Sequence, residues 1–428
     1  MNRKILALAL PSIVANITTP LLGLVDTAIV GHMGSAVYIG AIAVGGVMFN
    51  MLYWLFSFLR AGTSGLAAQA CGAADSAATS LVLWRSLMVA CGAGVLMVIL
   101  QWPLGQGLRW FVGPDPGTGA LAAEYFSILI YGAPAVLGMY ALSGWFLGMQ
   151  NSRMLMVTSV VINVCNIAVS LLLVYAAGWR IAGVATGSLA AQWIGFAVGL
   201  WLLRRYRIGR PRWGEVFRAE GLKRFFRVNF EVMLRTACLI AVTLWFTRKG
   251  ASQGAIVLAV NTLLMQLFLL FSYMMDGFAF AGEALVGKYV GARDFSALHR
   301  CVKGVFVWGL ALAAAFTLIY FLGGEAFLGL LSGDADVIEA SGEYYLWAAV
   351  VPFAGFAAFA WDGVFIGATL TRELLLSMFG AMAAFFILLY SLFPMMGNHA
   401  LWFAFIVYLV MRGALQTWLF LRNRKFRR

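Results

Sequence analysis

Long apolar runs, separated by short polar segments, recur from one end of this chain to the other. Each run has roughly 20 or more residues, the length that a helix needs to cross a hydrocarbon core of about 30 Å. The pattern therefore predicts an all-α integral membrane protein with about twelve transmembrane helices. The expected spans are 5–30, 36–60, 80–104, 121–149, 154–178, 181–203, 229–248, 254–287, 301–331, 340–368, 375–396 and 399–421.

The longest polar stretch, 204–228, divides the predicted spans into two groups of six. It is basic and contains Gly209, Pro211 and Gly214, residues that are typical of a loop. We interpret this stretch as a cytoplasmic linker between an N-lobe, 1–203, and a C-lobe, 229–421. A basic tail, 422–428, follows.

Two sequence matches indicate that the lobes arose by duplication. GWFLG at 144–148, followed by Arg153, matches GVFIG at 363–367, followed by Arg372; GAAD at 72–75 matches GARD at 291–294. Both matches have the same displacement along the chain, 219 residues (363 − 144 and 291 − 72), which we call the repeat shift. Six helices per repeat give both halves the same orientation, which predicts a pseudo-two-fold axis along the membrane normal and a central cleft. We interpret the paired glycines as positions of close helix packing.

Composition and charge agree with a membrane protein. Hydrophobic residues make up 63% of the chain and charged residues 11%, against roughly a quarter charged in soluble domains. The net charge of +13 could suit a nucleic acid, but most of the 30 Lys and Arg residues fall on alternate loops. The positive-inside rule then places both termini in the cytoplasm and accounts for the basic charge, so we expect no nucleic-acid partner.

No cofactor is predicted. The five cysteines and three histidines lack the spacing of metal ligands. GEALVGK at 282–288 is similar to a phosphate-binding loop, but Tyr289 replaces the required Ser or Thr and the segment ends a membrane span. Active transport, if present, is therefore expected to use an ion gradient.

Asp26 is the plainest candidate for a functional residue. It lies about 20 residues into the first span, in the half predicted to face outside, with no Lys or Arg within two helical turns. Ionisable residues inside the membrane are costly and are functional candidates by default. We interpret Asp26 as a proton-coupling carboxylate, with a purely structural carboxylate as the alternative. Pro11 and Pro20 predict bending of the same helix.

Polar residues on the fifth and sixth spans predict a pocket near Asp26. Residues of the fifth span are spaced by three and four and share a face, and two serines lie at a depth similar to that of Asp26. Ordinary hydrogen bonding between helices is the alternative. The residues are Asn163, Asn166 and Ser170 on the fifth span, and Thr186, Ser188 and Gln192 on the sixth.

The C-lobe carries charged residues of both signs inside its spans, toward the cytoplasmic half. Opposite charges together favour a paired structural network over a second ion site. A gate that forms when the cleft closes inward is a further alternative. The residues are Glu231, Arg235, Asp276, Glu283, Asp362 and Arg412.

Four stretches together resemble the multidrug and toxic compound extrusion family, specifically its DNA-damage-inducible F-type branch. They are PLLGLVDTAIVGH at 20–32, DGFAFAGE at 276–283, DGVFIGAT at 362–369 and GNHALW at 397–402. The resemblance implies two six-helix lobes and export of bulky, often cationic, organic compounds, coupled to protons or in some members to sodium. It also implies that Asp26 is the proton acceptor and that its helix bends at Pro11.

One departure from the family pattern matters for the coupling ion. The family usually has Asp four residues after the position of Asn166, where this chain has Ser170, and often has Thr where this chain has Ser188. Asp26 therefore lacks a like-charged neighbour, and a coupling scheme that shares one proton between two Asp residues is excluded. Sodium becomes less attractive, because a cation site prefers several anionic oxygens.

These observations predict a monomeric, multi-pass transporter of a prokaryotic inner membrane. Its predicted activity is proton-coupled export of amphipathic or cationic organic compounds by alternating access. Sodium-coupled antiport and flipping of a lipid-linked precursor are the alternatives; a flippase should have a more basic cavity. An integral-membrane enzyme is less favoured, because the sequence shows no paired His and carboxylate at membrane depth.

Overall fold

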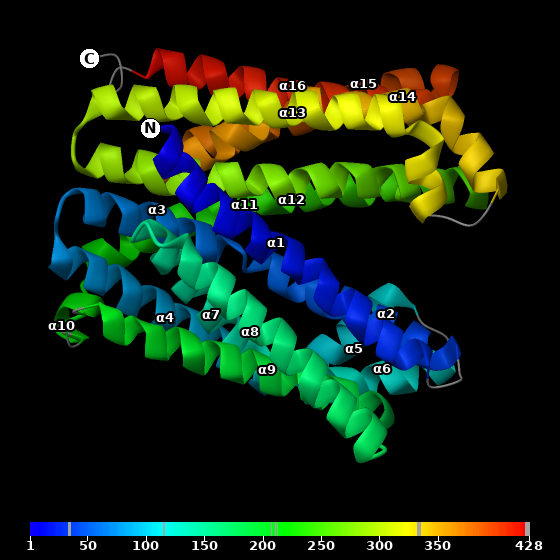
Figure 1. Ribbon diagram of the computed structural model, residues 1–428, viewed down its shortest axis with the longest axis horizontal. Coiled ribbons are helices and arrows are strands. Elements are labelled where there is room, and N and C mark those ends of the chain that lie inside the picture. Colours follow the sequence, from blue (N-terminus) through cyan, green and yellow to red (C-terminus); the bar gives the residue numbers. More distant parts are fainter. Residues whose placement is uncertain are drawn as a thin grey trace. The chain divides into compact units, whose positions relative to one another are not determined.

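The computed structural model describes residues 1–32, 36–113, 116–206, 208–209, 211, 213–331 and 335–423. Within these ranges the regular structure is entirely helical (Figure 1). The end of the predicted tail, 424–428, and positions 207, 210 and 212 of the predicted linker lie outside the described residues. The first half contains α1 (Asn2–Gly31), α2 (Ala36–Leu55), α3 (Phe58–Gly72), α4 (Ser76–Ile99), α5 (Gln101–Val112), α6 (Pro116–Leu129), η1 (Ile130–Gly132), α7 (Ala133–Gly148), α8 (Ser152–Leu171), η2 (Leu172–Ala176), α9 (Arg180–Leu202) and η3 (Leu203–Arg205). The second half contains α10 (Trp213–Val216), α11 (Ala219–Ala251), α12 (Ala255–Gly291), α13 (Phe295–Leu331), α14 (Ala335–Gly367), α15 (Thr371–Met396) and α16 (Asn398–Arg422).

Twelve helical segments of the described chain are long and apolar enough to cross a membrane, and each overlaps one predicted span. The prediction of an all-α membrane protein is confirmed. Some predicted boundaries are wrong: the span expected at 80–104 ends at Ile99, and the separate helix α5 begins at Gln101. The last part of the stretch predicted as linker, from Ala219 on, belongs to α11.

The internal duplication is visible in where the helices begin. Four helices of the first half have counterparts in the second half whose first residues are displaced by the repeat shift. The pairs of first residues are Ala36 and Ala255, Ser76 and Phe295, Pro116 and Ala335, and Ser152 and Thr371. Two turns repeat as well, because the only four non-glycine residues of the described chain with positive φ form two such pairs: Ala74 with Arg293, and Gln150 with Thr369.

The paired glycines lie where two helices approach each other closely, as interpreted from the sequence. A Cβ on Gly148 of α7 would lie 2.8 Å from the backbone oxygen of Ser64 in α3. A Cβ on Gly367 of α14 would lie 3.0 Å from the backbone nitrogen of Gly287 in α12. Small residues at these positions allow the helix backbones to pack directly on each other.

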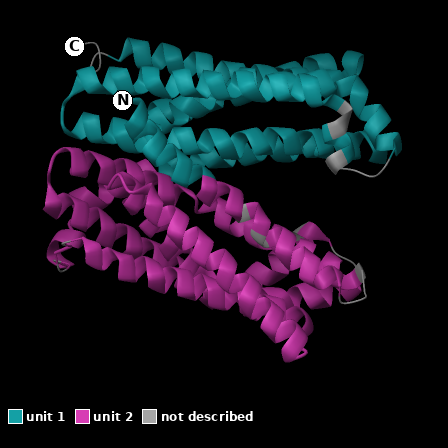
Figure 2. Cartoon of the chain, viewed as in Figure 1, with its two compact units in different colours: residues 1–13, 230–428 teal, residues 14–229 magenta. Residues whose placement is uncertain are grey.

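Contacts divide the chain into two compact units (Figure 2). Unit 1 comprises Met1–Ile13 and Phe230–Arg428, and unit 2 comprises Val14–Asn229. The division falls inside α1, which the sequence analysis assigned wholly to the N-lobe. The beginning of α1, up to Ile13, therefore packs with the second-half helices, and the rest of α1 packs with the first half.

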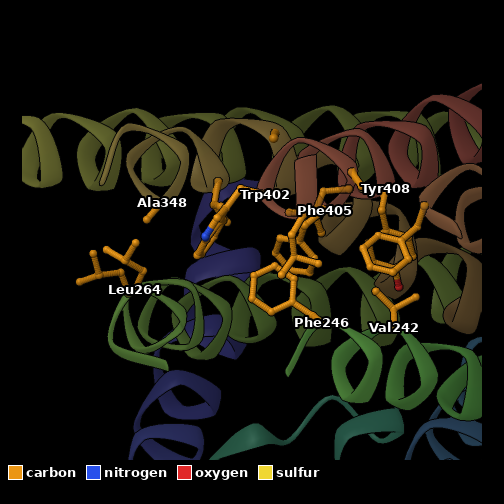
Figure 3. Close-up of a cluster of buried hydrophobic side chains, with 14 of the residues drawn as sticks. Val242, Phe246, Leu264, Ala348, Trp402, Phe405 and Tyr408 are labelled. Carbon is orange, nitrogen blue, oxygen red and sulfur yellow. The ribbon is translucent and has the colours of Figure 1, made fainter. Parts of the chain in front are cut away.

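Each unit has its own apolar core. In unit 1, aromatic rings of α11, α12 and α16 pack edge to face, with 5.1 Å between the ring centroids of Phe246 and Trp402 (Figure 3). In unit 2, the buried indole of Trp145 on α7 donates a hydrogen bond to the backbone oxygen of Thr79 on α4 over 2.9 Å. These contacts position the polar side chains described next.

Candidate functional site

Asp26 is buried in unit 2, with 5% of its surface exposed. It lies five residues before the end of α1, about 7.5 Å along the helix axis from Gly31. The Ser188 hydroxyl of α9 donates to Asp26 Oδ2 over 3.3 Å, and Asn166 Nδ2 of α8 donates to Ser188 Oγ over 2.7 Å. The Asn166 side chain also interacts directly with Asp26. The structure thus brings three of the predicted residues together, from three helices.

The close packing of α8 and α9 makes this group possible. A Cβ on Gly187 would lie 2.8 Å from the Cα atom of Ser170, so only glycine leaves room at this crossing. Ser188 follows Gly187 directly, and Asn166 lies one helical turn before Ser170. The glycine therefore places the serine hydroxyl within reach of the asparagine amide.

Tyr125 of α6 belongs to the same group and was missed by the sequence analysis. Its hydroxyl interacts electrostatically with Asp26 and forms a hydrogen bond with the Ser188 side chain, and the residue is 5% exposed. Gly45 of α2 makes room for its ring, because a Cβ there would lie 2.5 Å from a ring carbon of Tyr125. The internal repeat could have indicated Tyr125, because the pair Glu124 and Tyr125 occurs again as Glu343 and Tyr344, displaced by the repeat shift.

The surroundings of Asp26 are polar but uncharged. No basic side chain in the described part of the chain forms an ion pair with it, and its Oδ1 atom has no hydrogen-bond partner there. An ionised carboxylate buried without a counter-charge is costly. The group can therefore relieve that cost by binding a proton or a cation at Oδ1.

The other predicted pocket residues do not contact Asp26. Asn163 donates to the backbone oxygen of Ser159 in its own helix over 2.9 Å, and Thr186 is half-buried on α9. Ser170 is fully buried against Gly187, and the Gln192 side chain packs against Gly132. These four have no contact with Asp26 that the structure records.

The two prolines lie within α1, which runs as one helix (Figure 1). Pro11 is two residues before the point where the chain passes from unit 1 to unit 2. Bending at Pro11 or Pro20 stays a prediction, since one conformation does not test it.

In unit 1 the structure brings together Arg235, Asp362 and Arg412. Arg235 of α11 and Arg412 of α16 both donate to Asp362 Oδ2 of α14, the latter over 2.7 Å. Gln416 donates to Oδ1 of the same carboxylate over 2.8 Å, and Asp276 of α12 interacts electrostatically with Arg412. The network is thus paired, as the sequence analysis favoured.

Glu231 and Glu283 complete the predicted set in unit 1. Thr371 donates a hydrogen bond to the Glu231 carboxylate, and Glu283 is buried on α12. The sequence analysis missed Gln416, which belongs to the Asp362 network, and Thr371, the partner of Glu231. Gln416 follows Arg412 by four residues and so shares its helix face, a signal that the sequence contained.

Comparisons with known proteins agree with this architecture. A family model described as MatE matches residues 11–172 and 228–393. The chain is 37% identical to DNA damage-inducible protein F of Escherichia coli over 409 residues, which cover 95% of this chain and 89% of the relative. It is 25% identical to protein DETOXIFICATION 44, chloroplastic, of Arabidopsis thaliana, over 98% of this chain and 82% of that protein.

Solved structures share the fold. A MATE transporter of Vibrio cholerae matches with a TM-score of 0.92 at 14% identity, covering 100% of this chain and 98% of the other. A transporter of the MOP superfamily from Pyrococcus furiosus matches with a TM-score of 0.90 at 18% identity, covering 100% and 97%. The fold, the family model and the E. coli relative agree, and we conclude that the chain is a multi-pass membrane protein of the MatE family of multidrug and toxic compound extrusion transporters, not an enzyme.

Proposed function

We propose that this protein exports amphipathic, often cationic, organic compounds in exchange for protons, by alternating access, with Asp26 as the carboxylate that binds the coupling proton. The observation that carries the proposal is the buried, uncharged surroundings of Asp26. Its neighbours Ser188, Asn166 and Tyr125 can form hydrogen bonds with either protonation state, and none of them neutralises its charge.

Sodium is the second candidate for the coupling ion, and one observation supports it. Three oxygens of α1 and α8 are among the buried oxygens that have no hydrogen-bond partner within the described residues: Asp26 Oδ1, Asn166 Oδ1 and Ser170 Oγ. Hard cations bind oxygen ligands of this kind. Only one of the three carries a negative charge, whereas a proton needs only the single free carboxylate oxygen, and for this reason we favour the proton.

The alternative of a lipid-linked precursor flippase receives less support. Such a substrate carries phosphate and would need accessible cations. The two intramembrane arginines of unit 1, Arg235 and Arg412, both donate to Asp362 and are therefore already engaged in an ion pair. Amphipathic organic compounds without phosphate do not need accessible cations in the protein.

The membrane orientation is part of the proposal. We place the protein in a prokaryotic inner membrane as a monomer, with both termini in the cytoplasm, because the Lys and Arg residues cluster in alternate loops. Asp26 then lies in the outer half of the bilayer, where a periplasmic proton can reach it.

The test is transport of ethidium by purified protein in proteoliposomes, under an imposed pH gradient or an imposed sodium gradient. We expect the pH gradient alone to drive wild-type transport and Asp26→Asn to abolish it. The matched control is Asp75→Asn, which changes a carboxylate that caps α4 outside the predicted site. Undiminished pH-driven transport in Asp26→Asn would refute the role of Asp26, and transport driven only by sodium would replace the proton as coupling ion.

A further inference from the structure

Helix α5 (Gln101–Val112) is too short to cross a membrane. Its 12 residues span about 18 Å, against a hydrocarbon core of about 30 Å. Two of its tryptophans are largely exposed, Trp102 at 74% and Trp110 at 85%. Exposed tryptophans on an amphipathic helix are typical of the membrane interface. Since α5 directly follows the span α4, it lies where that span leaves the hydrocarbon core.

A cavity of about 420 Å³ lies between α5, α2 and α6 of unit 2. Its walls are mainly apolar and include Met48, Gly105, Ala123 and Phe126. Arg109, in the last turn of α5, is the one charged residue among the described residues of its lining. The half-buried Arg109 guanidinium forms no hydrogen bond or ion pair with any described residue. The cavity therefore offers an apolar surface beside a cation that has no partner among the described residues.

We propose that this cavity binds one glycerophospholipid, with its phosphodiester on Arg109 and part of an acyl chain against Met48 and Phe126. Charge complementarity identifies the head of the ligand, since a guanidinium can donate two parallel hydrogen bonds to a phosphate. The apolar walls identify the tail, and the interfacial position of α5 places both at the depth of a lipid headgroup. The size of the cavity is within the range of small-molecule sites.

The second half has no equivalent site among its described residues. The repeat shift carries Arg109 onto Leu328, which is buried in the apolar core of unit 1. The proposal thus gives one phospholipid per chain, bound to unit 2 only.

The lipid site is connected to the Asp26 group through a chain of packed aromatic rings. Phe126 stacks on Phe49 with 5.0 Å between ring centroids, and Phe49 packs edge-on against Tyr125 at 6.3 Å. A lipid against Phe126 would therefore support the ring layer that holds Tyr125 near Asp26. This consequence for coupling rests on the proposed function, whereas lipid binding itself does not.

The experiment measures how added lipid shifts the thermal unfolding midpoint of delipidated protein in dodecyl maltoside. Four additives are compared: dioleoylphosphatidylglycerol, dioleoylphosphatidylethanolamine, dioleoylglycerol and inorganic phosphate. We expect both phospholipids to stabilise the wild type, with one lipid bound per chain by native mass spectrometry. Arg109→Gln should raise the half-saturating lipid concentration about tenfold, the effect of losing one charge-assisted contact.

Two further variants make the test specific. Arg180→Gln removes another arginine from unit 2, outside this cavity, and should leave the lipid response unchanged. Ala123→Phe fills the cavity while keeping Arg109, and should weaken lipid binding in a protein that retains every charge. Equal stabilisation by dioleoylglycerol, stabilisation by inorganic phosphate alone, or equal effects of Arg109→Gln and Arg180→Gln would each overturn the proposal. None of these measurements depends on transport, so failure of the lipid site and failure of proton coupling are distinguishable.

Discussion

Replacing Asp362 by Asn should destabilise unit 1 more than any single change to its partners. Asp362 accepts hydrogen bonds from Arg235, Arg412 and Gln416. The side chain of Arg412 is 3% exposed and that of Arg235 is 16% exposed, so neither arginine can rehydrate fully after the carboxylate is lost. Leaving a buried charge unpaired costs about 3–5 kcal/mol.

A loss of this size is measurable as a shift in thermal unfolding. For a unit of about 200 residues, each kcal/mol corresponds to roughly 2–4 °C, so Asp362→Asn should unfold about 10 °C below the wild type. Arg235→Gln should cost less, because Asp362 would keep Arg412 as its partner. The double variant Asp362→Asn with Arg412→Gln should recover part of the loss, since it removes the most buried unpaired charge.

The assay is tryptophan fluorescence during heating in detergent, paired with ethidium transport in proteoliposomes. Asp294→Asn is the matched control, because this exposed carboxylate only caps α13 through the Ala297 amide and Asn caps equally well. If Asp362→Asn unfolds within about 2 °C of the wild type, the structural interpretation of the network is refuted. Loss of transport at unchanged stability would instead favour the gate.

Three further changes test the packing and the predicted pocket. Gly148→Ala should destabilise by about 1–3 kcal/mol, because its Cβ meets backbone atoms, whereas Gly46→Ala, with open space around it, should be neutral or slightly stabilising in the same unfolding assay. Thr369→Gly should raise the unfolding midpoint by the equivalent of about 1 kcal/mol, since a β-branched residue is strained at φ 52°; no gain would mean that the turn relaxes. Ser170→Asp should lower stability, because its side chain packs against Gly187. It should shift the pH dependence of ethidium transport only if the new carboxylate faces Asp26.

The membrane spans were predictable because a lipid environment permits few kinds of backbone structure. A backbone inside a bilayer must satisfy its own hydrogen bonds, so an apolar run of sufficient length becomes a helix. Breaks within such runs were not predictable. The turn at Leu100 separates α4 from α5 without Gly or Pro at that position, because a short change of backbone angles leaves no mark on hydropathy.

Part of the candidate site was predictable from membrane depth and from the spacing of polar residues on a helix face. Depth matched Ser170 and Ser188 to Asp26, and spacing placed Asn166 on the same helix face as Ser170. The structure brings Asn166 and Ser188 to Asp26, whereas it records no contact between Ser170 and Asp26. Tyr125 could not be selected by composition, since a tyrosine in an apolar span is usually part of the core. The partners of Asp362 lie 127 and 50 residues away along the chain, and only the packing of α11, α14 and α16 determines which arginine reaches it.

The repeated helix starts have a consequence for the ancestry of the chain. The helix starts have been kept between the two copies, yet neither Asp26 nor Asp362 is repeated in the other copy. The second-copy counterparts of Asp26, Asn166 and Ser188 are Trp245, Phe385 and Val407. In the reverse direction, Asp362 corresponds to Ser143. Fusion of two equal genes would have freed each copy to lose the polar residues that the other retained, while the paired glycines kept the close helix contacts of both copies. A tandem of two first halves would accordingly carry two copies of the Asp26 group.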